Sequence, residues 1–126
     1  MLKTLHYAPP AALTPLEAAI LAYLAAHYQL PALTAQVQHC RVSQREYSGA
    51  GFFTALAIAD PASPLLSDVA SPLEGCQIEV PGLTDGAGSL LFVREGRLHF
   101  LEVHTWGEGD IVPEASEFVL RPSLVK

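Results

Sequence analysis

The stretch HFLEVHTW, residues 99–106, places a glutamate between two histidines in a run that is otherwise mostly apolar. Imidazole and carboxylate groups serve as metal ligands and as general acids and bases. If the stretch is a β-strand, its side chains alternate between two faces. His99 then lies on the opposite face from Glu102 and His104, so the three side chains cannot form one ligand set.

Glu102 and His104 remain neighbours on one strand face, two positions apart. Two ligands are fewer than structural or catalytic zinc sites take from the protein, so we expect neither a metal nor another cofactor. An unpaired buried carboxylate is costly. We therefore expect Glu102 to lie at the edge of the sheet or to pair with Arg41 or Arg45, in a structural rather than a catalytic role.

The stretch REYSGAGFFT, residues 45–54, carries two glycines within a strand-like run. This pattern is typical of a β-bulge, or of a close approach by another backbone or a ligand. A phosphate-binding loop would need a helix after it, but strand-like FFTALAIA follows. Neither a GxSxG nor an HExxH motif is present. We therefore assign no catalytic residue.

A helix must begin at TPLE, residues 14–17. Thr14 suits the N-cap, Pro15 the first helical position and Glu17 the position that closes a capping box. The helix is apolar over most of its circumference, extends to about Tyr28 and ends before Pro31. The segment PALTAQVQ that follows fits a short second helix.

Strand-like runs fill much of the remaining chain. They occupy residues 40–47, 52–59, 75–80 and 118–122, together with two runs around the dipeptide Glu95-Gly96. The segment 60–72 holds three prolines and three serines and reads as an irregular loop. Helix first and antiparallel strands after it predict an α+β domain that spans residues 1–126: one or two N-terminal helices packed on a sheet of four to five strands.

The hairpin around Glu95-Gly96 has two possible registers. A two-residue turn pairs Arg94 with Arg97, whereas a bulge at Gly96 pairs Val93 with Arg97. We favour the bulge, because glutamate is a poor residue for positive φ. One face then carries Leu90, Phe92, Leu98 and Phe100, and the other carries Leu91, Val93, His99, Leu101 and Val103. Since both faces are largely apolar, we expect helices to cover one and a second subunit to cover the other.

The composition supports an association between subunits. Half of the residues are hydrophobic and only 16% are charged, against about 25% in typical soluble domains. The excess of apolar surface predicts a homodimer.

The net charge of −6 and scattered basic residues argue against nucleic-acid binding. The acids follow one another without an intervening Lys or Arg: Glu102, Glu108, Asp110, Glu114 and Glu117. They form either a solvated edge or a surface for a basic partner.

Two features indicate a cytoplasmic protein without a membrane anchor. The apolar run of residues 18–26 is too short to span a bilayer and lacks the flanks of a signal peptide. Cys40 and Cys76 lie in unrelated contexts, and free thiols in a reducing compartment are their simplest account, with a single disulfide as the alternative.

The chain resembles a family of small bacterial proteins without an assigned activity. The resemblance lies in an LTPLE-type helix start, the Arg-x-aromatic-Ser/Thr-Gly-x-Gly-Phe-Phe-Thr segment and a glycine-containing hairpin that ends in Leu-Glu-x-aromatic-Thr/Ser-aromatic. The matching positions are Arg45, Tyr47, Gly49, Gly51, Phe52, Phe53, Thr54, Gly86, Gly88, Gly96, Leu101, Glu102, Thr105 and Trp106. His104 departs from the pattern, which argues against a required ligand or base there. The resemblance implies that Arg45 and Glu102 share one feature, most simply a salt bridge.

The sequence favours a non-enzymatic binding protein, with proteins that neutralise a basic toxin as one fitting class. One alternative is an enzyme or small-ligand binder whose pocket surrounds Arg45 and Glu102, with Tyr47 and Trp106 as further binding residues. Another is a purely structural homodimer subunit.

Overall fold

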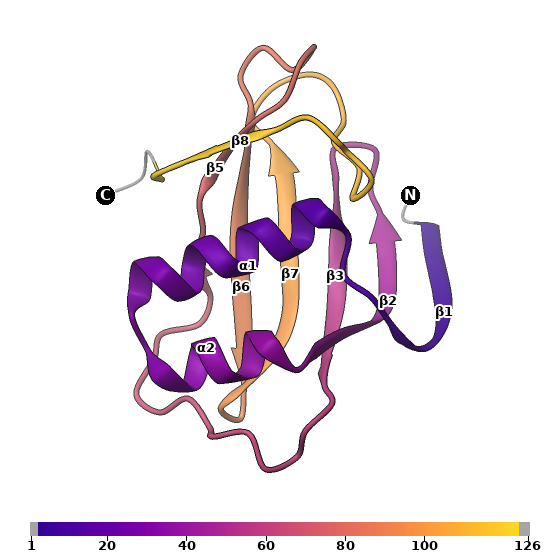
Figure 1. Cartoon of the computed structure of the whole chain (residues 1–126). Helices are drawn as coiled ribbons and strands as arrows, with labels where there is room; N and C mark the ends of the chain where they lie inside the picture. Colours follow the sequence, from indigo (N-terminus) through magenta and orange to yellow (C-terminus); the bar gives the residue numbers. More distant parts are fainter. Residues whose placement is uncertain (1–2, 124–126) are drawn as a thin grey trace.

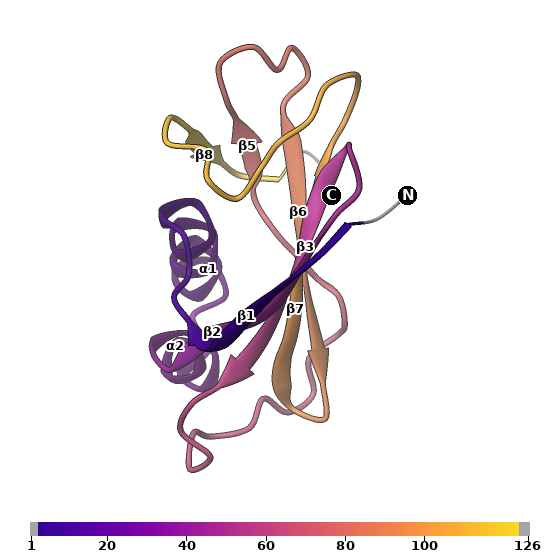
Figure 2. The same cartoon turned by 90° about the vertical axis from the view of Figure 1, so that its right-hand side faces the viewer.

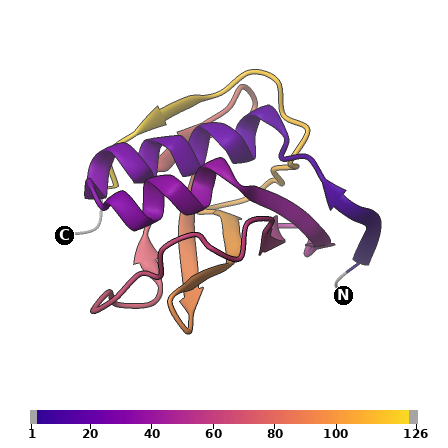
Figure 3. The same ribbon diagram turned by 60° about the horizontal axis from the view of Figure 1, so that its bottom comes forward.

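The computed structural model describes the backbone of residues 3–123 and the side chains of residues 12–123. Helices α1 (Pro15–Tyr28) and α2 (Pro31–Gln38) lie side by side on one face of a twisted antiparallel sheet (Figures 1, 2 and 3). The strands are β1 (Lys3–Ala11), β2 (Cys40–Tyr47), β3 (Gly51–Ile58), β4 (Leu73–Glu74), β5 (Gln77–Glu79), β6 (Ala87–Arg94), β7 (Arg97–Thr105) and β8 (Val119–Arg121). The predicted α+β class is confirmed.

The sheet has eight described strands, more than the four or five expected. Its order is β1-β2-β3-β7-β6-β5-β8, and the short β4 also pairs with β6. Two strands were not expected: the short β4, and β1, which precedes the helices and pairs with β2 at the sheet's edge. The sequence of β1 includes Pro9 and Pro10, and prolines are tolerated in edge strands, where a missing ladder donor costs little.

Helix α1 begins as the sequence predicts. The Glu17 amide donates to Thr14 Oγ1 at 3.2 Å, and the Thr14 amide donates to Glu17 Oε1 at 2.9 Å, which completes the capping box. The helix ends at Gln29, whose φ of 54° turns the chain into α2. No helix among residues 3–123 is both long and apolar enough to cross a membrane.

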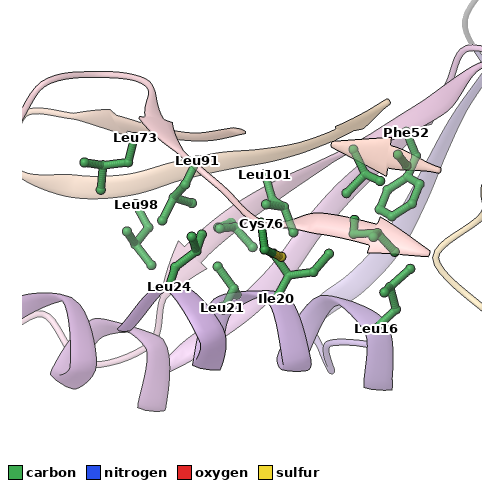
Figure 4. Packing of buried hydrophobic residues seen from close by; sticks show 14 of the residues in the cluster. Leu16, Ile20, Leu21, Leu24, Phe52, Leu73, Cys76, Leu91, Leu98 and Leu101 are labelled. Carbon is green, nitrogen blue, oxygen red and sulfur yellow. The ribbon is translucent and has the colours of Figure 1, made fainter. Parts of the chain in front are cut away.

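The hydrophobic core fills the space between the helices and the sheet (Figure 4). Helix α1 contributes Leu16, Ile20, Leu21 and Leu24, all with no exposed surface. The sheet contributes alternate residues of its central strands, among them Phe52, Leu91, Leu98 and Leu101. Because strand side chains alternate, this packing leaves the other half of the strand residues on the face away from the helices.

The hairpin between β6 and β7 adopts the register that we did not favour. Arg94 pairs with Arg97 around a two-residue turn, with φ of 53° at Glu95 and 79° at Gly96. The bulge lies further along, between Phe92 and Val93 and their partners, so Leu98 joins the core rather than the face of Phe100. The expected bulge at Gly96 is therefore wrong.

Hydrogen bonds from a residue outside the hairpin stabilise this turn and offset the conformational strain of a glutamate at positive φ. The side chain of Gln36, on α2, is fully buried. Its Nε2 donates to the carbonyls of Gly96 and Pro64, both at 2.8 Å, and its Oε1 accepts from the Leu98 amide at 2.9 Å. One side chain thus joins the helix, the hairpin and the loop of residues 60–72.

Replacing Gln36 with leucine is expected to lower the free energy of unfolding by about 2–4 kcal/mol, because buried backbone groups lose their partners. Chemical denaturation measures the change. Gln38 on the same helix is exposed, so Gln38→Leu is the matched control and should stay within about 0.5 kcal/mol of the parent. Equal effects of the two substitutions would contradict this role for Gln36.

Candidate functional site

The face of the sheet that lies away from α1 and α2 carries no helix formed by residues 3–123 (Figure 2). We call it the open face. Strand registers place its described residues in rows that run across the sheet. A middle row consists of Gln44, Ala55, Phe100 and Phe92, and the next row towards the carboxyl end of β7 consists of Glu46, Phe53, Glu102 and Leu90.

Three phenylalanines form a cluster at the centre of the open face. The rings of Phe92 and Phe100 stack with their centroids 4.2 Å apart, and the edge of Phe53 meets Phe100 at 5.9 Å. The His99 ring packs against Phe100 from the side of the β6–β7 hairpin turn, and the two ring centroids are 5.1 Å apart. All three phenylalanines are only partly buried. The open face therefore presents apolar aromatic surface where a one-sided antiparallel sheet would normally be polar.

Beside this cluster the open face has a hollow of about 320 Å³. Its lining combines aromatic rings with a carboxylate and an imidazole: Gln44, Glu46, Phe53, Ala55, His99 and Phe100. A hollow of this size is large enough for one inserted side chain or a small molecule. An anionic group beside aromatic rings favours a cationic occupant.

Glu102 and His104 also lie on the open face, as strand alternation predicts. The His104 Nδ1 atom is 3.5 Å from Glu102 Oε2, yet it is buried and makes no hydrogen bond among residues 12–123. The His104 ring meets Trp106 edge to face at 4.7 Å, and both rings pack over Gly88. No group of three or more His, Cys, Asp or Glu side chains suited to a metal ion occurs in the part of the chain that the structure describes.

Arg45 has a different partner from the one we expected. Its guanidinium binds Glu17 of α1, with Nε donating to Oε2 at 2.7 Å and Nη2 to Oε1 at 2.5 Å. The register Arg45–Thr54–Leu101 places Arg45 on the helix side of the sheet, whereas Glu102 is on the open face. The predicted Arg45–Glu102 salt bridge is therefore wrong, because the sheet separates the two side chains.

The Glu17 carboxylate is fully buried and Arg45 is only 3% exposed. Besides Arg45, the carboxylate accepts hydrogen bonds from the Thr14 amide and from Thr54 Oγ1, the latter at 2.5 Å. A two-pronged arginine–carboxylate pair with both oxygens further bonded is the arrangement that compensates burial of charge. In this cluster, Thr14–Glu17–Arg45–Thr54, the last three side chains are buried and Thr14 is half-buried, and together they fix α1 on the sheet.

The other two predicted binding residues also lie on different sides. Tyr47 shares the helix side with Arg45, and its hydroxyl donates to Glu114 at 3.5 Å. Trp106 is 50% exposed, and its Nε1 donates to Gln77 Oε1 at 2.7 Å. The four predicted residues thus do not gather at one site. Arg45 and Tyr47 lie on the helix side, while Glu102 and Trp106 border the open face.

The chain matches no protein-family model, and it has no significant match among curated proteins or solved structures.

Sequence reasoning missed Glu17 as a buried ion-pair residue, although a signal was present. Glu17, Leu21 and Leu24 follow the i, i+4, i+7 spacing of one helix face. Both leucines are fully buried, so the same face buries the carboxylate. Extending the apolar stripe back by one turn would have identified Glu17 as a charge in need of a partner.

Neither cysteine behaves as a nucleophile. Cys40 and Cys76 are both free and buried. Burial, with the nearby Glu17 charge as a second cause, raises the pKa of Cys40 to about 12. Burial likewise raises the pKa of Cys76. Both thiols stay protonated near neutral pH, and a protonated thiol is a poor nucleophile.

Proposed function

We propose that this protein is a binding protein whose open face docks on another protein chain. The observation that carries the proposal is the cluster of Phe53, Phe92 and Phe100 on the sheet face opposite α1 and α2. The three rings are partly exposed, and an aromatic patch at the surface with a polar rim is typical of interaction sites on proteins.

The rim of the open face fits this function. Gln44, Glu46, His99 and Glu102 surround the phenylalanines and supply polar and charged groups. Protein interfaces commonly have an aromatic centre that excludes water and a polar rim that sets specificity. The hollow beside Phe100 is then a socket for a side chain of the partner.

An enzyme or ligand site around Arg45 and Glu102 has less support. Arg45 is occupied by Glu17 inside the core, and Glu102 lies on the other face of the sheet. The acidic residues 108–117 belong to the segment that crosses from the end of β7 to the helix side of the sheet (Figure 2), where Glu114 accepts a hydrogen bond from Tyr47, so they are not needed for the proposed docking. The two free, buried thiols support a reducing cytoplasm as the place where the protein works.

A photo-crosslinking amino acid at position 99 tests the proposal. His99 is exposed and contacts Phe100, so the probe sits at the edge of the aromatic cluster. The full chain is irradiated in the cells that naturally produce it, and mass spectrometry identifies the adducts. We expect a protein adduct at position 99, because the proposed partner covers this face.

The same probe at Ala26, an exposed position of α1, is the control and should not yield that adduct. Phe53→Lys in the position-99 protein should abolish it, because a charge in the patch opposes burial. Circular dichroism verifies that the variant is folded. Adducts at position 26 equal to those at position 99, or none at either, would contradict the proposed function.

A further inference from the structure

We propose that the partner of the open face is a second copy of this chain, packed face to face with its strands antiparallel to those of the first. The inference rests on the proposed function and names its partner. The observation behind it is the arrangement of charge and side-chain size along the strands. When a second copy is related to the first by a two-fold rotation, acidic residues of one copy face basic residues of the other, and large side chains face small ones.

The axis of the rotation runs along the middle row Gln44, Ala55, Phe100 and Phe92. On one side of this row the neighbouring row carries two carboxylates, Glu46 and Glu102. On the other side the register places Arg41 opposite Ala57, and Arg94 opposite Arg97. The registers thus place carboxylates on one side of the middle row and guanidinium groups on the other, with the exposed Glu95 beyond them in the hairpin turn.

Strand alternation and the bulge in β2 produce this separation. Cys40 and Val42 face the core, so Arg41 between them faces outward. The bulge between Val42 and Gln44 then turns Gln44 and Glu46 to the same outward face. Arg94 comes two residues after Phe92 and reaches the guanidinium side of the middle row from β6.

A two-fold rotation about the middle row brings the carboxylate side of one copy over the guanidinium side of the other. Glu46 then faces Arg41 of the second copy along the same strand, and this contact occurs twice in the dimer. A rotation about an axis parallel to the strands would instead set like charges against each other. Charge complementarity therefore selects the antiparallel arrangement.

Side-chain size gives the same result on β3. Phe53 and Ala57 lie on opposite sides of Ala55, two residues away in each direction. The rotation places the ring of Phe53 over the small side chain of Ala57 in the second copy. Phe100 lies on the axis and meets its own counterpart, so the aromatic surface is buried at the centre. The result is a two-sheet sandwich, in which mean strand directions stay within about 30° of each other.

The arrangement is tested by reversing the charge at position 41 or at position 46 and then mixing the two variants, which restores opposite charges across the interface. Sedimentation equilibrium measures the dimer dissociation constant of the parent chain, Arg41→Glu, Glu46→Arg and an equimolar mixture of the two variants. Each variant alone places like charges opposite each other twice, so its dissociation constant should rise at least about tenfold. In the mixture every such contact is again an opposite pair, and dimers should form with about the parent's affinity.

Glu117→Arg changes the net charge as Glu46→Arg does, but at an exposed position outside the open face, and should leave the dimer unchanged. A parent chain that stays monomeric up to about 1 mM overturns the inference. So does a mixture of dimerising variants that remains as weak as each variant alone. If the position-99 probe then captures a different protein, the proposed function stands while the second copy is rejected.

Discussion

Replacing Arg45 with methionine is expected to lower the free energy of unfolding by about 3–5 kcal/mol, since the Glu17 charge is then buried without its cation. Glu17 has no exposed surface, so water cannot replace the guanidinium. The remaining donors, the Thr14 amide and the Thr54 hydroxyl, are dipoles and not charges. Urea denaturation followed by circular dichroism measures the loss.

Two further variants separate burial of charge from simple loss of a side chain. Glu17→Met combined with Arg45→Met removes both charges, so the double variant should be more stable than Arg45→Met alone. Arg121→Met is the matched surface control. Arg121 Nε donates to Glu79 at 2.8 Å, but both side chains are at least half exposed, and such pairs contribute about 1 kcal/mol or less. A similar loss in Arg45→Met and Arg121→Met would refute the special cost of the buried charge.

Replacing Gly51 with alanine is expected to cost about 3 kcal/mol or more, from backbone strain and overpacking together. Gly51 starts β3 with a φ of 139°, a conformation that side-chain-bearing residues rarely adopt. A Cβ atom there would collide with the Val103 carbonyl on β7, which is backbone and cannot move aside by a rotamer change. The substitution therefore pushes β3 and β7 apart at the centre of the sheet.

Gly49, two residues earlier in the same turn, provides the control. Its φ of 84° is also positive, but a Cβ atom there would meet nothing within 4 Å. Gly49→Ala should therefore show the conformational penalty alone, about 1–2 kcal/mol. Thermal and urea denaturation of both variants test the difference. If Gly49→Ala proves as harmful as Gly51→Ala, the collision with β7 is not the cause.

Local features of the fold could be predicted from the sequence. The start of α1 depends on Thr14, Pro15 and Glu17, which lie within one turn, and the structure confirms their capping box. The two strands around Glu95-Gly96 were recognised for the same reason. Their register was not, because glutamate disfavours positive φ locally, while the distant contacts of Gln36 decide the outcome.

Strand β1 could not be predicted, because its two prolines argue locally against a strand. Only its place at the edge, beside β2, makes them acceptable. The apolar character of both faces of β6 and β7 did predict that one face would be left without helices. The phenylalanine cluster on that face could not be foreseen, since it requires the order β3-β7-β6.

The candidate site was the least predictable part, for a physical reason. Arg45 and Glu102 are charged residues on two separate strand-like segments, β2 and β7, and spacing alone cannot say which face each occupies. The bulge in β2 reverses the alternation between Val42 and Gln44, which sends Arg45 to the helix side. The helix start and the segment of residues 45–54 nevertheless meet, because the Glu17 carboxylate accepts from the Thr14 amide and also binds Arg45 and Thr54.

That shared carboxylate has a consequence for how the molecule opens. The first turn of a helix usually frays at little cost, yet here fraying would release Glu17 and leave Arg45 buried without it. The capping box and the ion pair share Glu17 Oε1, which accepts from both the Thr14 amide and Arg45, so α1 cannot loosen at its start while the sheet stays intact. Helix and sheet should therefore unfold cooperatively, with the amides of the first turn exchanging hydrogen as slowly as those of the central strands.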